Sequence, residues 1–359
     1  MNNSIKERIY KFDNIKLLSI LLVVVGHVID PYTGKSDMFR SLFIFIYSFH
    51  MPLFIFISGL FQKRFSDTNK LKINKIAFYV TLGFALKVLN ALSRMVRSGN
   101  FSMKVFGGGA IDWYLFVLSM FMVTAYLVRK VHPAITLSVA FLLGTVSGYF
   151  PFICDDMWLS RYFVFLPIYL IGYYMTPELL IKIEKKGVTK IISGLFMLLY
   201  FVLCFRALPL VYKLRPLFTG RNPFSSSALF DGCGFQHRLL CYAISLILCM
   251  AVFSFIPNIK VPILSNMGAN TLSVYFWHRP ILYLLSATQF STFVLSLGDP
   301  MYKIILLTFA LLLTLVLSID VFMIPLKALG KLIDKLKPVW CYVLIIAPFL
   351  IFPIITKVL

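Results

Sequence analysis

The sequence predicts an all-α, polytopic integral membrane protein with about 10–11 transmembrane helices, and three observations support this prediction. Hydrophobic residues make up 60% of the 359 residues, and the mean hydropathy is +0.87. Only 14% of the residues are charged. The apolar residues form long continuous runs rather than segments that alternate over about ten residues, which favours helices over barrel strands. Helices also satisfy their backbone hydrogen bonds within one segment, as lipid requires.

Eleven runs are apolar and long enough to be assigned as spans, with boundaries good to a few residues. Residues 1–359 are expected to form a single membrane domain, with no soluble domain appended. The predicted spans are 15–30, 40–62, 75–92, 111–128, 134–150, 160–176, 190–212, 238–257, 264–288, 302–324 and 339–356. The longest loop, from about 213 to 237, is predicted to lie outside the cell membrane.

The net charge of +21 is explained by a membrane better than by nucleic acid. Lys and Arg collect on the short cytoplasmic loops of multispanning proteins, where anionic lipid heads attract them. Most basic residues of this chain fall in such loops when the N-terminus is placed inside. We therefore expect a cytoplasmic N-terminus, membrane lipids as partners and no nucleic-acid partner.

The first span holds two ionisable residues, Lys16 and His27, on one face. They are eleven residues apart, close to three helical turns, which separates them by about 16 Å along the axis. Ionisable groups at membrane depth are costly and mark functional sites. His27 is either a general base for a hydroxyl or a histidine bonded to a neighbouring helix. Lys16 is either an anchor at the membrane surface or a cation for the phosphates of a cytosolic donor. Asp30 either holds the second ring nitrogen of His27 or ends the helix.

The second span contains a proline and a second imidazole. Pro52 in a helix interior frees a backbone carbonyl and bends the helix, and His50 lies just before it. Ser58-Gly59 permits close approach of another helix. Lys63 and Arg64 close this span beside Lys16, either as part of a phosphate site or as anchors.

Two further groups are candidates for substrate binding. Trp113 and Tyr114 begin the fourth span, as part of the interfacial aromatic belt or as an aromatic platform for a sugar. His278 and Arg279 lie in apolar surroundings in the ninth span, where Arg279 must face a polar cavity or an acidic partner. No Cys/His cluster has the spacing of metal ligands, so no metal is expected.

Several of these segments resemble the acyltransferase 3 family of membrane-bound acyltransferases. The stretch from Arg8-Ile9 through Lys16 to Val25-Gly26-His27 is similar to the opening motif of the family. The stretch Phe49-His50-Met51-Pro52-Leu53-Phe54-Ile55-Phe56-Ile57-Ser58-Gly59 resembles its second-span motif, in the form closest to the branch that acetylates fucose and other capsular or exopolysaccharide sugars. Weaker likenesses are Trp113-Tyr114-Leu115 and Tyr275…His278-x-Pro280, and the whole resemblance runs from about 8 to about 325.

The resemblance implies helices throughout and transfer of an acyl group, usually acetyl from acetyl-CoA, to a hydroxyl of an extracytoplasmic glycan or lipid. By match, His27 is the essential histidine, Lys16 the basic position, and Lys63 with Arg64 the basic pair. Lysine replaces the commoner arginine at position 16, which gives a point charge without bidentate geometry. Some members have a C-terminal hydrolase-like domain; none is expected here, so acceptor binding is expected in the membrane domain or its outer loops.

We therefore expect an O-acetyltransferase of the bacterial cytoplasmic membrane that uses acetyl-CoA as donor. Its acceptor would be a sugar hydroxyl of a surface polysaccharide or of a lipid-linked precursor, with polysaccharide assembly proteins as further partners. The alternatives are a flippase or exporter of lipid-linked glycan and a polysaccharide polymerase; a carrier predicts internal repeats, which are not found. The expected catalytic residues are His27, His50 and His278, the donor-binding residues Lys16, Lys63 and Arg64, and the acceptor-binding residues Trp113, Tyr114 and Arg279.

Overall fold

The computed structural model describes residues 9–64, 70–108, 111–184, 187–227, 230 and 232–358, and it confirms the all-α fold. The structure is 81% helical, with no strand in these residues. Its α-helices are α1 Tyr10–Ile29, α2 Asp37–Tyr47, α3 His50–Arg64, α4 Ile73–Ser98, α5 Trp113–Leu127, α6 Pro133–Val146, α7 Leu159–Tyr174, α8 Pro177–Glu184, α9 Gly187–Arg206, α10 Leu208–Val211, α11 Arg215–Thr219, α12 Gly234–Phe255, α13 Pro262–Ala269, α14 Thr271–Ser286, α15 Phe290–Ser296, α16 Met301–Leu317, α17 Asp320–Asp334 and α18 Pro338–Val358.

The lengths of the apolar helices fit a multi-pass membrane protein. Within the described residues, five helices are long and apolar enough to cross a membrane, or up to seven if each of two bent pairs forms one span. The five are Tyr10–Tyr32, Asp37–Gln62, Ile73–Ser98, Gly187–Arg206 and Gly234–Phe255. The second of them consists of α2 and most of α3, counted together as one span. Shorter apolar helices cover Trp113–Leu127, Pro133–Tyr149 and Pro338–Ile354. The number of crossings, placed at about eleven by the sequence, stays a prediction.

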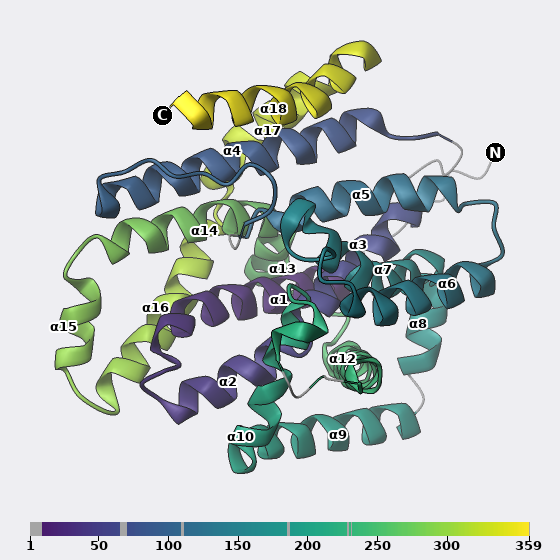
Figure 1. Ribbon diagram of the computed structural model, residues 1–359. Helices are drawn as coiled ribbons and strands as arrows, with labels where there is room; N and C mark the ends of the chain where they lie inside the picture. The colour runs from purple at the N-terminus through teal and green to yellow at the C-terminus, as the bar shows by residue number, and fades with distance from the viewer. Residues whose placement is uncertain are drawn as a thin grey trace.

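Helix α1 lies in the interior of the bundle (Figure 1) and contacts α2, α3, α13, α14 and α16. Helices α17 and α18 lie along one edge beside α4, and α9 lies at the opposite edge. The core consists of buried apolar clusters, and α1 belongs to the two largest. Phe12 and Ile15 pack in one cluster, and Ile20, Val23 and Val24 pack in the other. The residues of α1 that bear charge are therefore held by a well-packed helix.

The second predicted span, 40–62, is broken between α2 and α3 at Ser48-Phe49. Pro52 lies in the first turn of α3, where its missing N–H is tolerated. The carbonyl of Ser48, four residues before Pro52, accepts a hydrogen bond of 2.5 Å from the Ser245 hydroxyl on α12. The proline thus frees a carbonyl as predicted, another helix satisfies it, and His50 becomes the first residue of α3.

Helices α3 and α7 pack with their backbones in contact. A Cβ atom on Gly59 would collide with the backbone oxygen of Tyr169, and one on Gly172 would collide with that of Phe56. The close approach predicted from Ser58-Gly59 is therefore confirmed, and Gly172 supplies the matching position on α7.

The ninth and tenth predicted spans, 264–288 and 302–324, do not run straight through. The ninth breaks at Asn270, between α13 and α14, and the tenth bends by 51° between α16 and α17. The two breaks bond to each other, because the Asn270 amide donates to the Ser318 carbonyl at 3.0 Å and the Ser273 hydroxyl donates to the Leu317 carbonyl at 2.7 Å. The predicted spans ran through these breaks because the apolar runs on either side dominate the hydropathy of the whole segment.

Candidate functional site

Two cavities adjoin in the bundle, and Met51 of α3 lines both. The first, here called the Lys16 cavity, has a volume of about 210 Å³ and contains Lys16, Ser58 and Tyr114 in its wall. The second, here called the His27 cavity, has a volume of about 130 Å³ and contains His27, His50 and Trp113. Lys16 and His27 lie on the same helix, so α1 contributes one ionisable side chain to each cavity.

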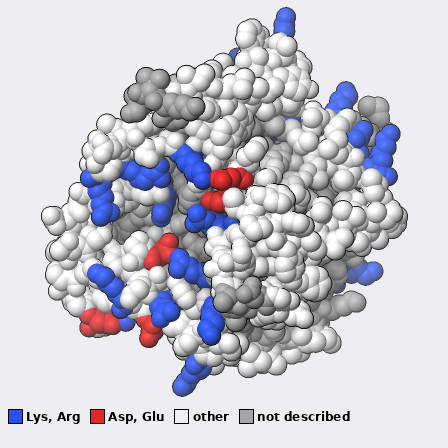
Figure 2. Space-filling view, viewed as in Figure 1, with Lys and Arg blue, Asp and Glu red and all other residues white. Residues whose placement is uncertain are grey.

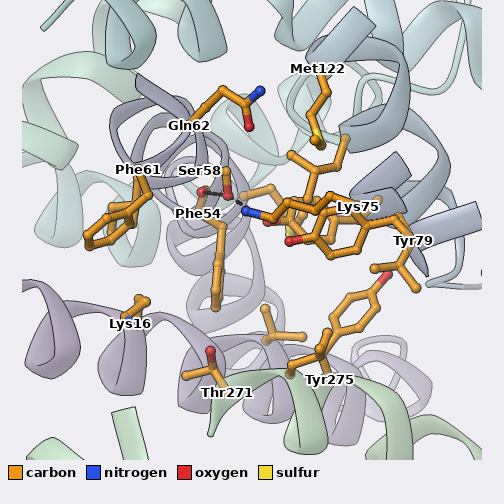
Figure 3. A pocket seen from close by; sticks show the side chains of 17 residues that line it. Lys16, Phe54, Ser58, Phe61, Gln62, Lys75, Tyr79, Met122, Thr271 and Tyr275 are labelled. Atoms are coloured by element: carbon orange, nitrogen blue, oxygen red, sulfur yellow. Dashed lines mark hydrogen bonds between the residues drawn. The ribbon is translucent and has the colours of Figure 1, made fainter. Parts of the chain in front are cut away.

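The Lys16 cavity is mainly apolar, with cations from two helices (Figure 3). Lys16 comes from the start of α1, Gln62 from the end of α3 and Lys75 from the start of α4. Elsewhere its wall holds tyrosines, of which Tyr114 makes a hydrogen bond of 2.7 Å with the Ser58 hydroxyl. The wall therefore combines apolar side chains with hydroxyl and ammonium groups.

Lys16 keeps one charged and one aromatic contact in this wall. Its ammonium nitrogen is 2.7 Å from an Asp13 carboxylate oxygen and 5.3 Å from the centre of the Phe61 ring. Lys63 and Arg64 end α3, and their side chains lie outside the part of the chain that the structure describes. Their proposed contact with phosphates therefore stays a prediction.

The three histidines predicted to be catalytic lie near one another, and two of them line the His27 cavity. His27 and His50 both line it. The ring of His278 stacks on that of His27, with centroids 5.5 Å apart and planes inclined by 28°. Residues from α1, α3 and α14 are therefore brought together although they are up to 251 positions apart in the chain, from His27 to His278.

Backbone contacts fix the tautomers of two of these rings. His50 Nδ1 lies 2.8 Å from the Ile46 carbonyl, and His278 Nδ1 lies 2.8 Å from the Val274 carbonyl. A carbonyl only accepts, so Nδ1 carries the hydrogen and Nε2 of the neutral ring keeps its lone pair. Nε2 of His278 is buried and has no hydrogen-bond partner among the described residues. Both rings can therefore accept a proton at Nε2.

Arg279 faces the His27 cavity, and its guanidinium lies 4.7 Å from the centre of the Tyr283 ring. Three arginines that were not predicted from the sequence line the same cavity. The three further arginines in the wall are Arg161, Arg215 and Arg221. Arg161 follows the start of the predicted span 160–176, so the cost of a cation in an apolar run could have revealed it.

Asp30 is the residue that ends α1, in agreement with one of its two predicted roles. Its carboxylate accepts a hydrogen bond of 3.0 Å from Arg215 rather than from His27. No hydrogen bond joins Asp30 to His27 among the described residues, so the other predicted role, orientation of the His27 ring, stays a prediction. The long loop predicted at 213–237 supplies that arginine, through the short helix α11.

Trp113 and Tyr114 are neighbours in sequence but reach different cavities. Trp113 lines the His27 cavity, stacks on Phe165 at 5.6 Å and lies 4.7 Å from the Arg161 guanidinium. Tyr114 lines the Lys16 cavity. They do not form one aromatic platform, and the role of each in binding a substrate stays a prediction.

Comparison with known proteins gave one match. A family model described as an acyltransferase domain matches residues 9–323, which is most of the chain. No curated protein and no solved structure matches. Within the described residues, no three His, Cys, Asp or Glu side chains are grouped so that they could hold a metal ion.

Proposed function

Because this chain belongs to the acyltransferase 3 family over residues 9–323 and is a membrane acyltransferase, we propose that it is an O-acetyltransferase that uses cytosolic acetyl-CoA. The proposed acceptor is a sugar hydroxyl of a surface polysaccharide or of its lipid-linked precursor. The observation that supports this most is that Lys16 and His27, from one helix, line two cavities that adjoin at Met51.

The Lys16 cavity suits the donor. A pantetheine arm is long, thin and uncharged, which matches an apolar cavity of about 210 Å³ that holds a few hydroxyl groups. The cavity is too small for the whole coenzyme, so the nucleotide and its phosphates would remain at the mouth. Lys16 and Lys75 would bind those phosphates there, as ammonium groups do elsewhere. The acetyl thioester would then lie beside Met51.

The His27 cavity suits the acceptor and the chemistry. His27 would take the proton of the acceptor hydroxyl as its oxygen attacks the thioester carbonyl carbon. The new C–O bond forms, the C–S bond breaks, and the imidazolium returns its proton to the departing thiolate. His50 lines the same cavity with Nε2 as its lone-pair nitrogen, and His278 would position His27 through the stacked contact. His50 would assist as a second proton acceptor.

Membranes that contain the protein provide the direct test. With labelled acetyl-CoA and isolated polysaccharide, label should reach the glycan in the wild type. His27→Ala should lower the rate at least about 100-fold, since a general base contributes that much. His132→Asn is a matched control, because His132 is exposed and only caps α6, a role that asparagine can keep.

Two results would overturn the proposal. Label that never enters the glycan would exclude this donor and acceptor pair, and would favour a carrier or a polymerase. Equal rates for His27→Ala and wild type would remove His27 from the reaction.

A further inference from the structure

The His27 cavity contains more positive than negative groups. Four guanidinium groups reach it from separate segments: Arg161 on α7, Arg215 at the start of α11, Arg221 in the loop after α11, and Arg279 on α14. Basic side chains surround a hollow over α1 and α14 on the face shown in Figure 2, where acidic ones are fewer.

Two carboxylates compensate the four arginines within the described residues. Asp30 pairs with Arg215 at 3.0 Å. Asp155 is shared, at 3.5 Å from Arg161 and 3.3 Å from Arg221. The nearby Asp112 is bound to Lys87 at 2.9 Å, so that pair is neutral by itself. Two positive charges in this wall have no carboxylate of their own among the residues described.

Several guanidinium N–H groups are also without an acceptor. Arg161 is 4% exposed, its Nε has no hydrogen-bond partner among the described residues, and its Nη1 has only the 3.5 Å ionic contact with Asp155. The Nε atoms of Arg221 and Arg279 are buried and lack a partner in the same way. Buried donors and buried charges of this kind are unfavourable unless an acceptor or counter-ion approaches them.

We propose that the His27 cavity binds an anionic group of the acceptor, a phosphate or a carboxylate, through these four arginines. The planar guanidinium fork matches both groups with paired hydrogen bonds. The acceptor is then an acidic sugar, a phosphorylated sugar or a diphosphate-linked saccharide, and the bound anion holds a nearby hydroxyl against His27. This inference rests on the proposed function for the identity of the anion as part of an acceptor.

Binding measured without any acyl donor tests it. The full-length protein in lipid nanodiscs is titrated separately with inorganic pyrophosphate and with glucuronate. At least one probe should bind, and Arg221→Gln and Arg279→Gln should each weaken binding about 10-fold. The side chain of Arg221 is 41% exposed and that of Arg279 is partly buried. Size-exclusion profiles check that each variant is folded. Lys16→Gln reports any pyrophosphate bound in the Lys16 cavity, and His132→Asn, at an exposed position outside both cavities, is the control that should leave the affinity unchanged.

The outcomes separate the possible acceptors and the two proposals. Preference for pyrophosphate supports a phosphate-bearing acceptor, and preference for glucuronate supports an acidic sugar. No binding of either probe, or binding that responds to Lys16→Gln and not to the arginine variants, would overturn the inference. If anion binding depends on the arginines while no label is transferred to any glycan, the anion site stands and the acetyltransferase proposal falls.

Discussion

Lys16 and Lys75 contribute to the same cavity in different ways. Lys16 has Asp13 as a close partner and lies beside the Phe61 ring, whereas the side chain of Lys75 reaches across the cavity toward Ser58 (Figure 3). The charge of Lys16 is therefore held in a defined place. A phosphate-binding group needs this, whereas a lysine that only anchors the helix at the membrane surface does not.

A change at Lys16 should be felt in donor binding. Lys16→Ala is expected to raise the KM for acetyl-CoA about 10-fold, because a charge-assisted hydrogen bond is lost. Lys16→Arg should raise it much less, since the charge remains. Steady-state kinetics with membranes measure both, and Lys70→Ala, an exposed lysine away from the cavity, is the control. Equal KM values for the alanine and arginine variants would point to simple anchoring.

The sequence reveals some site residues and conceals others for a physical reason. Lys16 and His27 lie on one helix, so their spacing alone relates them. Arg215 pairs with Asp30, 185 positions away in the chain. Arg221 pairs with Asp155, 66 positions away. Such pairs depend on how loops fold over the bundle, which a local pattern does not determine. Arg161 is an intermediate case. The sequence shows a cation in an apolar run, which is energetically costly, but it does not show that Asp155 is the partner of this cation.

At the scale of elements, the contact between α3 and α7 holds His50 and Ser58 in place relative to the rest of the bundle. Gly59 and Gly172 allow it, since any side chain at either position meets a backbone carbonyl of the other helix. Backbone atoms cannot move aside as the end of a flexible side chain can. The contact is therefore intolerant of even one added carbon.

Gly59→Ala should for this reason destabilise the protein by at least about 1–3 kcal/mol. The melting temperature of purified protein in detergent is the measurement. Gly34→Ala is a matched glycine control, because a Cβ there has no atom within 4 Å. An unchanged melting temperature for Gly59→Ala would mean that the two helices pack less closely than described.

The elements were predictable where the information is local. Long apolar runs correctly indicated helices such as α1, α4 and α12, since hydropathy is a sum over neighbours. The breaks between helices were not predictable in this way, except that Pro52 was expected to free a carbonyl and bend its helix. The ends of α2, α13 and α16 are stabilised by Ser245 and Asn270, which bond to carbonyls of other helices. Those bonds exist only once the helices are packed.

At the scale of the whole molecule, the proposed function requires a particular orientation in the membrane. The Lys16 cavity must open to the cytoplasm, where acetyl-CoA is made, and the His27 cavity must face outward. The distribution of Lys and Arg predicts this orientation, with the N-terminus inside.

Labelling with a membrane-impermeant maleimide tests the orientation. Asn100→Cys, in the loop between α4 and α5, should be modified in intact cells. Lys70→Cys, just before α4, should be modified only after the cells are permeabilised. Wild-type protein gives the background from its native cysteines. The reverse pattern would turn the Lys16 cavity outward and remove access to a cytosolic donor.

Met51 has a consequence for the cell as well as for the reaction. Among the described residues it is the one that lines both cavities, so on the proposed function a group handed from one to the other passes its thioether. If the proposed transfer takes place there, two carbons leave the cytosol while the coenzyme stays behind, and the membrane that sustains the proton-motive force stays sealed. Decoration of the cell exterior would proceed without leakage of ions.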